Sequence, residues 1–229
     1  MACRQTGFAM LATSSVQEVM DLAGVAHLAA IESSVPFMHF FDGFRTSHEI
    51  QKVEVMDYEV FDRLLDREAV KNFRERALTF ENPVTRGSAQ NDDVYFQTRE
   101  IQNKYYDAVP AVVADYMAEI SKVTGRDYAP FVYYGAEDAT DVVIAMGSVC
   151  DTLKQAVDYL NKQGQKVGCV NVHLYRPFAP EYLTKVLPAT VKRIAVLDRT
   201  KEPGSLGEPL FLDVKAAFYG KAKAPYIIG

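Results

Sequence analysis

The chain has 229 residues, of which 48% are hydrophobic and 24% charged, so it can bury one large core or two modest ones. Its 25 basic and 30 acidic residues give a net charge of −5 without a basic run, which argues against a nucleic-acid partner bound through phosphates. No apolar stretch predicts a membrane span, and the first residues, MACRQTGF, lack the pattern of a secretory signal.

The cysteines are widely spaced, at Cys3, Cys150 and Cys169. An odd number without CxxC spacing is a poor disulfide framework, and four thiolates for an iron–sulfur cluster are not available. We therefore expect reduced thiols, a cytoplasmic location and no metal site on this chain alone.

The first segment of the chain predicts a strand, a helix and a second strand. Residues 8–13 read as a strand, and Ser15 with Glu18 has the spacing of a capping box with reciprocal bonds. Apolar residues then recur every three or four positions over 15–33, and VPFMHFFDG (35–43) reads as a buried strand. A strand, helix and strand in this order predict a parallel sheet.

After these elements, the alternation of strands and helices becomes irregular. Residues 57–65 and 67–78 predict short amphipathic helices, 81–97 a polar excursion, and 98–124 a helix that contains Pro110. Two strands are too few for a sheet that covers the long first helix, so we expect the rest of this sheet in sequence outside these residues.

After a predicted linker at 126–140, predicted strands and helices alternate regularly. Strands are predicted at 141–149, 166–174, 193–199 and in the final APYIIG, and helices at 150–164, 180–187 and 208–220. The sequence thus predicts an α/β fold: an incomplete doubly wound sheet in residues 1–130, followed by a small parallel α/β domain in residues 131–229.

Few motifs carry chemistry. The turn at Gly147-Ser148 could present backbone N–H groups to an anion, but we favour Ser148 as the cap of its own helix. The histidines are scattered; we interpret His27 and His39 as core residues, because they lie in apolar elements, and we expect no metal chemistry from them.

The loop FDGFRTSHEIQ (41–51) follows a predicted buried strand, where open α/β sheets place their sites. It carries five polar residues that we take as a candidate site or interface: Asp42, Arg45, Ser47, His48 and Glu49. The alternative is structural, with Ser47 starting a short helix and Arg45 paired with Glu49 at i, i+4 spacing.

A second loop, LDRTKEPGSLGEP (197–209), follows a strand in the same way. Its charged residues Asp198, Arg199, Lys201 and Glu202 are typical either of a solvated turn or of an interface.

Several blocks of sequence carry a resemblance: RQTGFAML (4–11), HFFDGFRTSHEIQK (39–52), RGSAQNDDVYFQ (86–97), and LYRPF (174–178) with LDRTKEPG (197–204). Together they resemble the pyruvate:ferredoxin (flavodoxin) oxidoreductase family, over essentially the whole chain and in the right order. The match corresponds to a minor, internal part of that family's long chain.

The resemblance implies a thiamine-diphosphate enzyme that decarboxylates pyruvate, forms acetyl-coenzyme A and passes electrons through [4Fe–4S] clusters to ferredoxin or flavodoxin. Residues 1 to about 130 resemble the C-terminal part of the domain that contacts the thiamine pyrimidine. Residues 131–229 resemble the transketolase C-terminal domain. The implied partners are the remaining domains of a longer chain, a second copy in a homodimer, and the electron acceptor.

The family's thiamine-activating glutamate and pyruvate-contacting arginine belong before these residues. Its magnesium and diphosphate site and its cluster cysteines belong after them. No catalytic residue is therefore carried over, and we expect the chain alone to be inactive. One alternative is a separately encoded assembly subunit; another is an unrelated ligand-binding doubly wound protein, against which the matching blocks argue.

Overall fold

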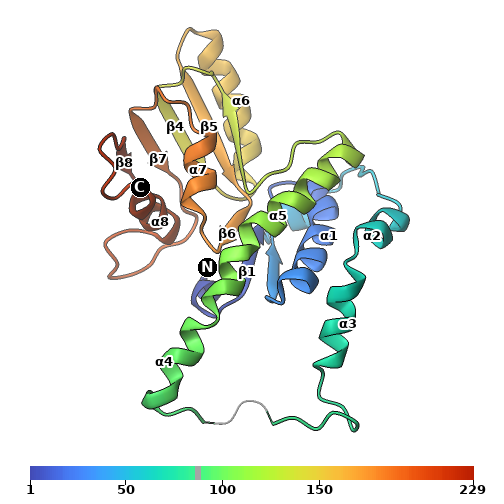
Figure 1. The fold of residues 1–229 in the computed structure, drawn as a ribbon. Coiled ribbons are helices and arrows are strands. Elements are labelled where there is room, and N and C mark those ends of the chain that lie inside the picture. The colour runs from blue at the N-terminus through green and yellow to red at the C-terminus, as the bar shows by residue number, and fades with distance from the viewer. Residues whose placement is uncertain (86–88) are drawn as a thin grey trace.

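The computed structural model describes residues 1–85 and 89–229, and in them the strands form two sheets (Figure 1). The first sheet has the order β2-β1-β6, from Phe37–Phe40, Ala9–Ala12 and Leu174–Arg176. The second has the order β3-β5-β4-β7-β8, from Phe131–Gly135, Val167–Val172, Asp141–Ala145, Arg193–Val196 and Tyr226–Ile228. The architecture is α/β with parallel pairing in both sheets, as predicted.

The predicted strand, helix and strand are confirmed as β1, α1 (Val16–Ser33) and β2, with β1 and β2 parallel. The capping box is only half right. The Ser15 hydroxyl accepts a hydrogen bond from the Glu18 backbone N–H at 3.2 Å, as expected. The Glu18 carboxylate, however, accepts from the backbone N–H of Ser14 at 2.6 Å and not from that of Ser15. The carboxylate thereby satisfies a donor one residue earlier.

The middle of the chain is more helical than predicted. Helices α2 (Tyr58–Leu64) and α3 (Arg67–Glu75) lie where they were expected. Helix α4 (Asp92–Glu100) begins inside the predicted polar excursion, so the excursion ends earlier than predicted. Residues 86–88 of the excursion, and of the family block that begins there, lie outside the described residues.

The long helix α5 (Asn103–Thr124) contains Pro110, as predicted, but begins five residues late because the chain turns between α4 and α5. It ends at Gly125, whose left-handed conformation (φ 70°) is one that glycine adopts without steric cost. Helices α1 and α5 pack on each other and bury Leu22, Val25 and Val113.

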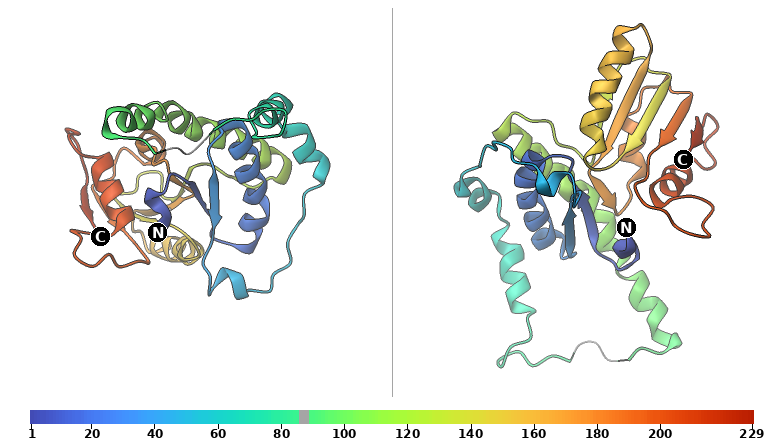
Figure 2. Two further views of the ribbon diagram at one scale, coloured as in Figure 1. Left: turned by 90° about the horizontal axis from the view of Figure 1, so that it is seen from below. Right: turned by 180° about the vertical axis from the view of Figure 1, so that it is seen from behind.

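The second sheet follows the predicted alternation. Its parallel strands are β4 (Asp141–Ala145), β5 (Val167–Val172), β7 (Arg193–Val196) and β8 (Tyr226–Ile228), and its helices are α6 (Val149–Lys162), α7 (Pro180–Val186) and α8 (Pro209–Ala217). Leu183 of α7 and Leu210 of α8 share a core with Val142 and Ile144 of β4. Helix α6 lies on the other face of the sheet (Figure 2).

The predicted linker at 126–140 is wrong, because it contains strand β3 (Phe131–Gly135), which pairs antiparallel with β5. The aromatic and β-branched run FVYYG suits a strand, and β5 offers it a free edge. The predicted strand 166–174 also divides: β5 stays in the second sheet, whereas β6 pairs antiparallel with β1 of the first.

Strand β1 therefore belongs to two cores among the described residues. Met10 packs with Tyr175 of β6 in the core of the second sheet. Leu11 packs with Leu174 in the core formed with α1 and α5. Because successive side chains of a strand point to opposite faces, one pair of strands supplies both cores. The domain boundary predicted between residues 130 and 131 stays a prediction, because β6 of the predicted second domain pairs with β1 of the predicted first domain.

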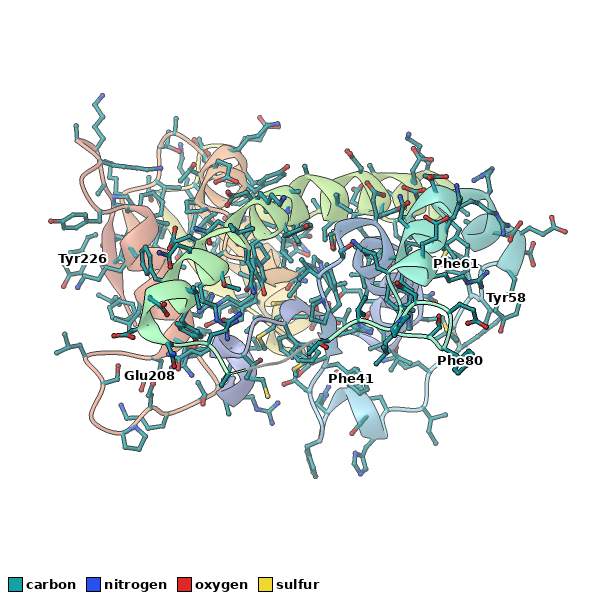
Figure 3. The ribbon with its side chains drawn as sticks, turned by 60° about the horizontal axis from the view of Figure 1, so that its bottom comes forward. Phe41, Tyr58, Phe61, Phe80, Glu208 and Tyr226 are labelled. Carbon is teal, nitrogen blue, oxygen red and sulfur yellow. The ribbon has the colours of Figure 1, made fainter. Side chains whose placement is uncertain are left out.

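No helix within residues 1–85 and 89–229 is both long and apolar enough to cross a membrane. Helices α3 and α4 extend away from both sheets on one side of the molecule (Figure 1). Phe80, on the segment between them, is labelled in Figure 3 and is 96% exposed.

Limited proteolysis with chymotrypsin is expected to cut after Phe80 well before it cuts after Phe131. Phe80 is exposed and outside regular structure, whereas Phe131 is 1% exposed and held in β3 by β5. Mass spectrometry of the first fragments gives the order of cleavage. Early cleavage after Phe131 would show that β3 is a loosely held linker after all.

Candidate functional site

The loops that follow β2, β4 and β7 meet in a crevice between the two sheets. Two adjoining cavities of about 420 and 560 Å³ lie there. Both are lined by Asp42, Met146, Leu197, Asp198 and Arg199. Carboxyl ends of parallel strands are where open α/β sheets bind ligands, so this crevice is the candidate functional site.

Asp42 joins the two loops that the sequence singled out. One carboxylate oxygen, Oδ2, accepts a hydrogen bond from the backbone N–H of Ser148 at the start of α6. The other, Oδ1, accepts from Nη1 of Arg199 at 2.6 Å. The Asp42 side chain is only 14% exposed, so these partners replace water around it.

The turn after β4 is built around this carboxylate. Gly147 has φ +87°, and a Cβ atom at this position would lie 2.6 Å from Asp42 Oδ2, so a larger residue would displace the carboxylate. The expectation that Ser148 caps its own helix is wrong, since its side chain makes no capping bond. The acceptor at the N-terminus of α6 comes instead from Asp42, more than one hundred residues earlier in the chain.

The environment of Asp42 favours its ionised form. Burial by itself would raise the pKa of this carboxyl, but the hydrogen bond from Ser148 and the ion pair with Arg199 together outweigh burial and hold the pKa below its usual range. Asp42 is thus a carboxylate at neutral pH.

The rest of the 41–51 loop is folded mostly on itself. Arg45 Nε lies 2.8 Å from Glu49 Oε1, which is the pair that the structural alternative required. Thr46–His48 form one turn of 3₁₀ helix, so the short helix expected to start after Ser47 is absent from this described segment. The Ser47 hydroxyl donates to the carbonyl of Gly43.

The structure thus divides the candidate residues of this loop. Asp42 contacts the loops of the second sheet, and Arg45 lines the larger crevice cavity. Ser47 and His48 are exposed, with Ser47 Oγ 2.8 Å from His48 Nδ1. Whether these residues act in catalysis or assembly stays a prediction.

The charged residues of the 197–209 loop are paired within the chain. The Asp198 carboxylate accepts from the backbone N–H groups of Leu210 and Phe211, at 3.1 and 2.9 Å, and so caps α8. Further ion pairs join Lys201 to Glu208 at 2.8 Å and Glu202 to Arg4 at 2.6 Å. The loop is therefore bonded to other segments of the chain through Asp198, Arg199 and Glu202, whereas its tip at 203–206 is exposed to solvent.

The histidines are placed differently from the expectation. His27 is exposed, so its interpretation as a core residue is wrong; helix α1 turns this side chain outward. His39 is partly buried, and burial, followed by the charge of His27, lowers its pKa. The fully buried histidine is His173, between β5 and β6, with Nδ1 2.9 Å from the carbonyl oxygen of Ala12. Nothing in its sequence context distinguishes it, because its partners come from distant segments.

The described residues contain no group of three or more histidine, cysteine or acidic side chains that could hold a metal ion. Cys3, Cys150 and Cys169 are free thiols. Burial raises the pKa of Cys169 to about 11 and that of Cys150 further, so both buried cysteines are protonated at neutral pH.

Two family models match consecutive parts of the chain. The model described as "Pyruvate flavodoxin/ferredoxin oxidoreductase, thiamine diP-bdg" matches residues 1–118, and "Pyruvate:ferredoxin oxidoreductase core domain II" matches residues 139–229. The chain belongs to the pyruvate:ferredoxin/flavodoxin oxidoreductase family. The resemblance stated from the sequence blocks is thereby confirmed.

Relatives in this family are similar over the whole chain. Pyruvate-flavodoxin oxidoreductase of Enterobacter agglomerans is 62% identical over 228 residues, and pyruvate:ferredoxin oxidoreductase of Moorella thermoacetica is 56% identical over 229 residues. These residues are 100% of this chain but 19% and 20% of the two relatives. The chain therefore spans about one fifth of their length.

A solved structure shares the fold. It is the 2-oxoglutarate:ferredoxin oxidoreductase from Magnetococcus marinus with 2-oxoglutarate, coenzyme A and succinyl-CoA bound. The TM-score is 0.55 at 14% identity, and the match covers 96% of this chain and 38% of that one. At this identity the likeness shows the arrangement of elements and not the ligands.

We expect Asp42 to stabilise the fold at neutral pH and to lose this effect in acid. Because its pKa is lower in the folded state, its stabilisation is present above the pKa of the unfolded chain, near 4, and is lost as pH falls through the folded value. The melting temperatures of the protein and of Asp42→Asn, measured from pH 7 downward, should differ most at pH 7, and the difference should shrink as pH falls below about 4. A difference independent of pH would contradict the ionised state of Asp42.

Proposed function

We propose that the chain is part of a thiamine-diphosphate-dependent pyruvate oxidoreductase that makes acetyl-coenzyme A and reduces ferredoxin or flavodoxin. The observation that carries this proposal is the identity of 62% and 56% with pyruvate-flavodoxin and pyruvate:ferredoxin oxidoreductases over the full chain. The order of the two family models along the chain supports it as well.

The donors present here do not make a complete cofactor site. Magnesium requires several oxygen ligands and a [4Fe–4S] cluster requires cysteine thiolates. No metal-binding group occurs among the described residues, and Cys150 and Cys169 are buried. We propose that the remaining domains of a longer protein supply the diphosphate, magnesium and cluster sites, and we derive no catalytic step from this chain by itself.

In this proposal, residues 1 to about 130 form one side of the thiamine pyrimidine site, and residues 131–229 form the transketolase-like unit beside it. The crevice would then face the other domains, with the loop 41–51 at its rim. The assembled enzyme would be a cytoplasmic homodimer. These assignments rest on the family and on the position of the crevice at the strand ends.

The chain of residues 1–229 alone is expected to be colourless and to reduce no dye when pyruvate and coenzyme A are added. The protein encoded by the full reading frame should do so. Iron analysis, absorbance spectra and dye reduction on both proteins test this expectation, and a related full-length oxidoreductase serves as the positive control. Stoichiometric iron or pyruvate-dependent reduction by the chain alone would contradict it.

If the reading frame ends at these residues on both sides, the proposal of a contiguous enzyme is wrong. The alternative, a separately encoded assembly subunit, then predicts a different result. Adding this chain to separately expressed partner subunits should restore pyruvate-dependent dye reduction.

In the longer enzyme, Arg45→Ala or His48→Ala is expected to lower turnover or domain assembly more than tenfold, equivalent to about 1.4 kcal/mol. Arg45 is 70% exposed in its pair with Glu49, and such pairs contribute little to stability, so the melting temperature should move little.

Arg67→Ala is the matched control, because Arg67 is 68% exposed and also pairs with a carboxylate, that of Asp62, and neither residue lines the crevice cavities. It should leave turnover and assembly unchanged. If Arg45→Ala and His48→Ala also leave both unchanged per folded molecule, the loop has only a structural role.

A further inference from the structure

The Asp42 carboxylate is bonded to two segments of the second sheet at once. Its partners are the first turn of α6, through the Ser148 N–H, and the loop after β7, through Arg199. We propose that these three residues form a latch, the Asp42 latch, which holds the 41–51 loop against the second sheet and thereby sets the opening of the crevice. The inference goes beyond the proposed function and does not depend on it.

Within the loop, Asp42 is the residue whose hydrogen bonds reach the second sheet. Among the described residues, the loop's other hydrogen bonds stay inside it or run to the first sheet, such as that from the Thr46 hydroxyl to the Ser14 carbonyl at 3.4 Å. The hydrogen bonds that cross to the second sheet are those of Asp42. Loss of this carboxylate therefore releases the loop on one side only.

Neither Ser148 nor Asp198, the polar neighbours of the two partners, takes the place of Asp42. The Ser148 side chain does not cap α6, so the Ser148 N–H depends on the Asp42 oxygen. Asp198, the neighbour of Arg199, has both carboxylate oxygens turned toward the N–H groups of α8. The two aspartates thus have separate partners, and neither is free to replace the other.

Hydrogen exchange on the intact protein, read by mass spectrometry, tests the latch. Asp42→Ala should speed exchange in residues 43–51 and in the first turn of α6 by about fivefold or more, the effect of losing a helix N-cap. Peptides from α5 and from β4 should keep their exchange rates.

Two further variants separate the two halves of the latch. Asp42→Asn keeps an oxygen that can accept from Ser148 but loses the charge that pairs with Arg199, and Arg199→Ala removes the pair alone. Both should speed exchange in the loop and leave the first turn of α6 protected. The control Arg45→Ala breaks only the bond to Glu49, within the loop, and should also leave that turn protected.

A change at Gly147 tests the same contact without touching Asp42. Gly147→Ala places a Cβ atom where the Asp42 carboxylate lies and also strains its own turn, because Gly147 has φ +87°. The turn and α6 are affected in both backgrounds, so the cycle is read in residues 43–51, where the effect on exchange should be large in the wild-type background and small in Asp42→Ala. The latch is wrong if Asp42→Ala leaves the loop and α6 unchanged. It is also wrong if exchange rises equally throughout the second sheet, or if the effects of Asp42→Ala and Gly147→Ala simply add.

Discussion

Strand β1 is buried on both faces, and the rest of the structure depends on how its two faces are covered. Ala9 and Leu11 point into the core with α1 and α5, and Met10 points into the core of the second sheet. Pairing with β6 adds Leu174 to the first core and Tyr175 to the second. Truncating a large side chain at such a position costs about 2–5 kcal/mol, so this seam holds the two sheets together.

The seam also determines where the crevice lies. Because β6 continues directly from the end of β5, the pairing of β6 with β1 brings the carboxyl ends of β2, β4 and β7 near one another. The loops that follow these strands then meet, and Asp42 reaches Ser148 and Arg199. The contacts in the crevice are therefore a consequence of strand pairing and not of local sequence.

A buried carboxylate, that of Asp21, joins α1 to the segment that follows α5. Asp21 of α1 is fully buried and accepts from Arg126 Nε at 2.7 Å, from the Tyr128 hydroxyl at 2.6 Å and from Gln17 Nε2 at 3.0 Å. A buried carboxyl group is tolerated when its oxygens have hydrogen-bonding partners, as they do here. These bonds fasten the chain after α5 to α1 and direct it toward β3, which explains why the segment predicted as a linker is ordered.

The sequence by itself determined the elements whose signal is local. Hydrophobic periodicity located α1 and the alternation of strands and helices after residue 140, and Gly125 marked the end of α5. The family was also readable from short blocks of residues. The position of the candidate loop after β2 followed from the same pattern.

Tertiary structure alone decided the features that join distant segments. The division of residues 166–174 into β5 and β6, the strand β3, the burial of His173 and the cap of α6 by Asp42 all depend on partners far away in the chain. Periodicity reports which side of an element is apolar. It does not report which other element covers that side, because strand pairing and the burial of polar groups are settled only when the complete set of neighbours is in place.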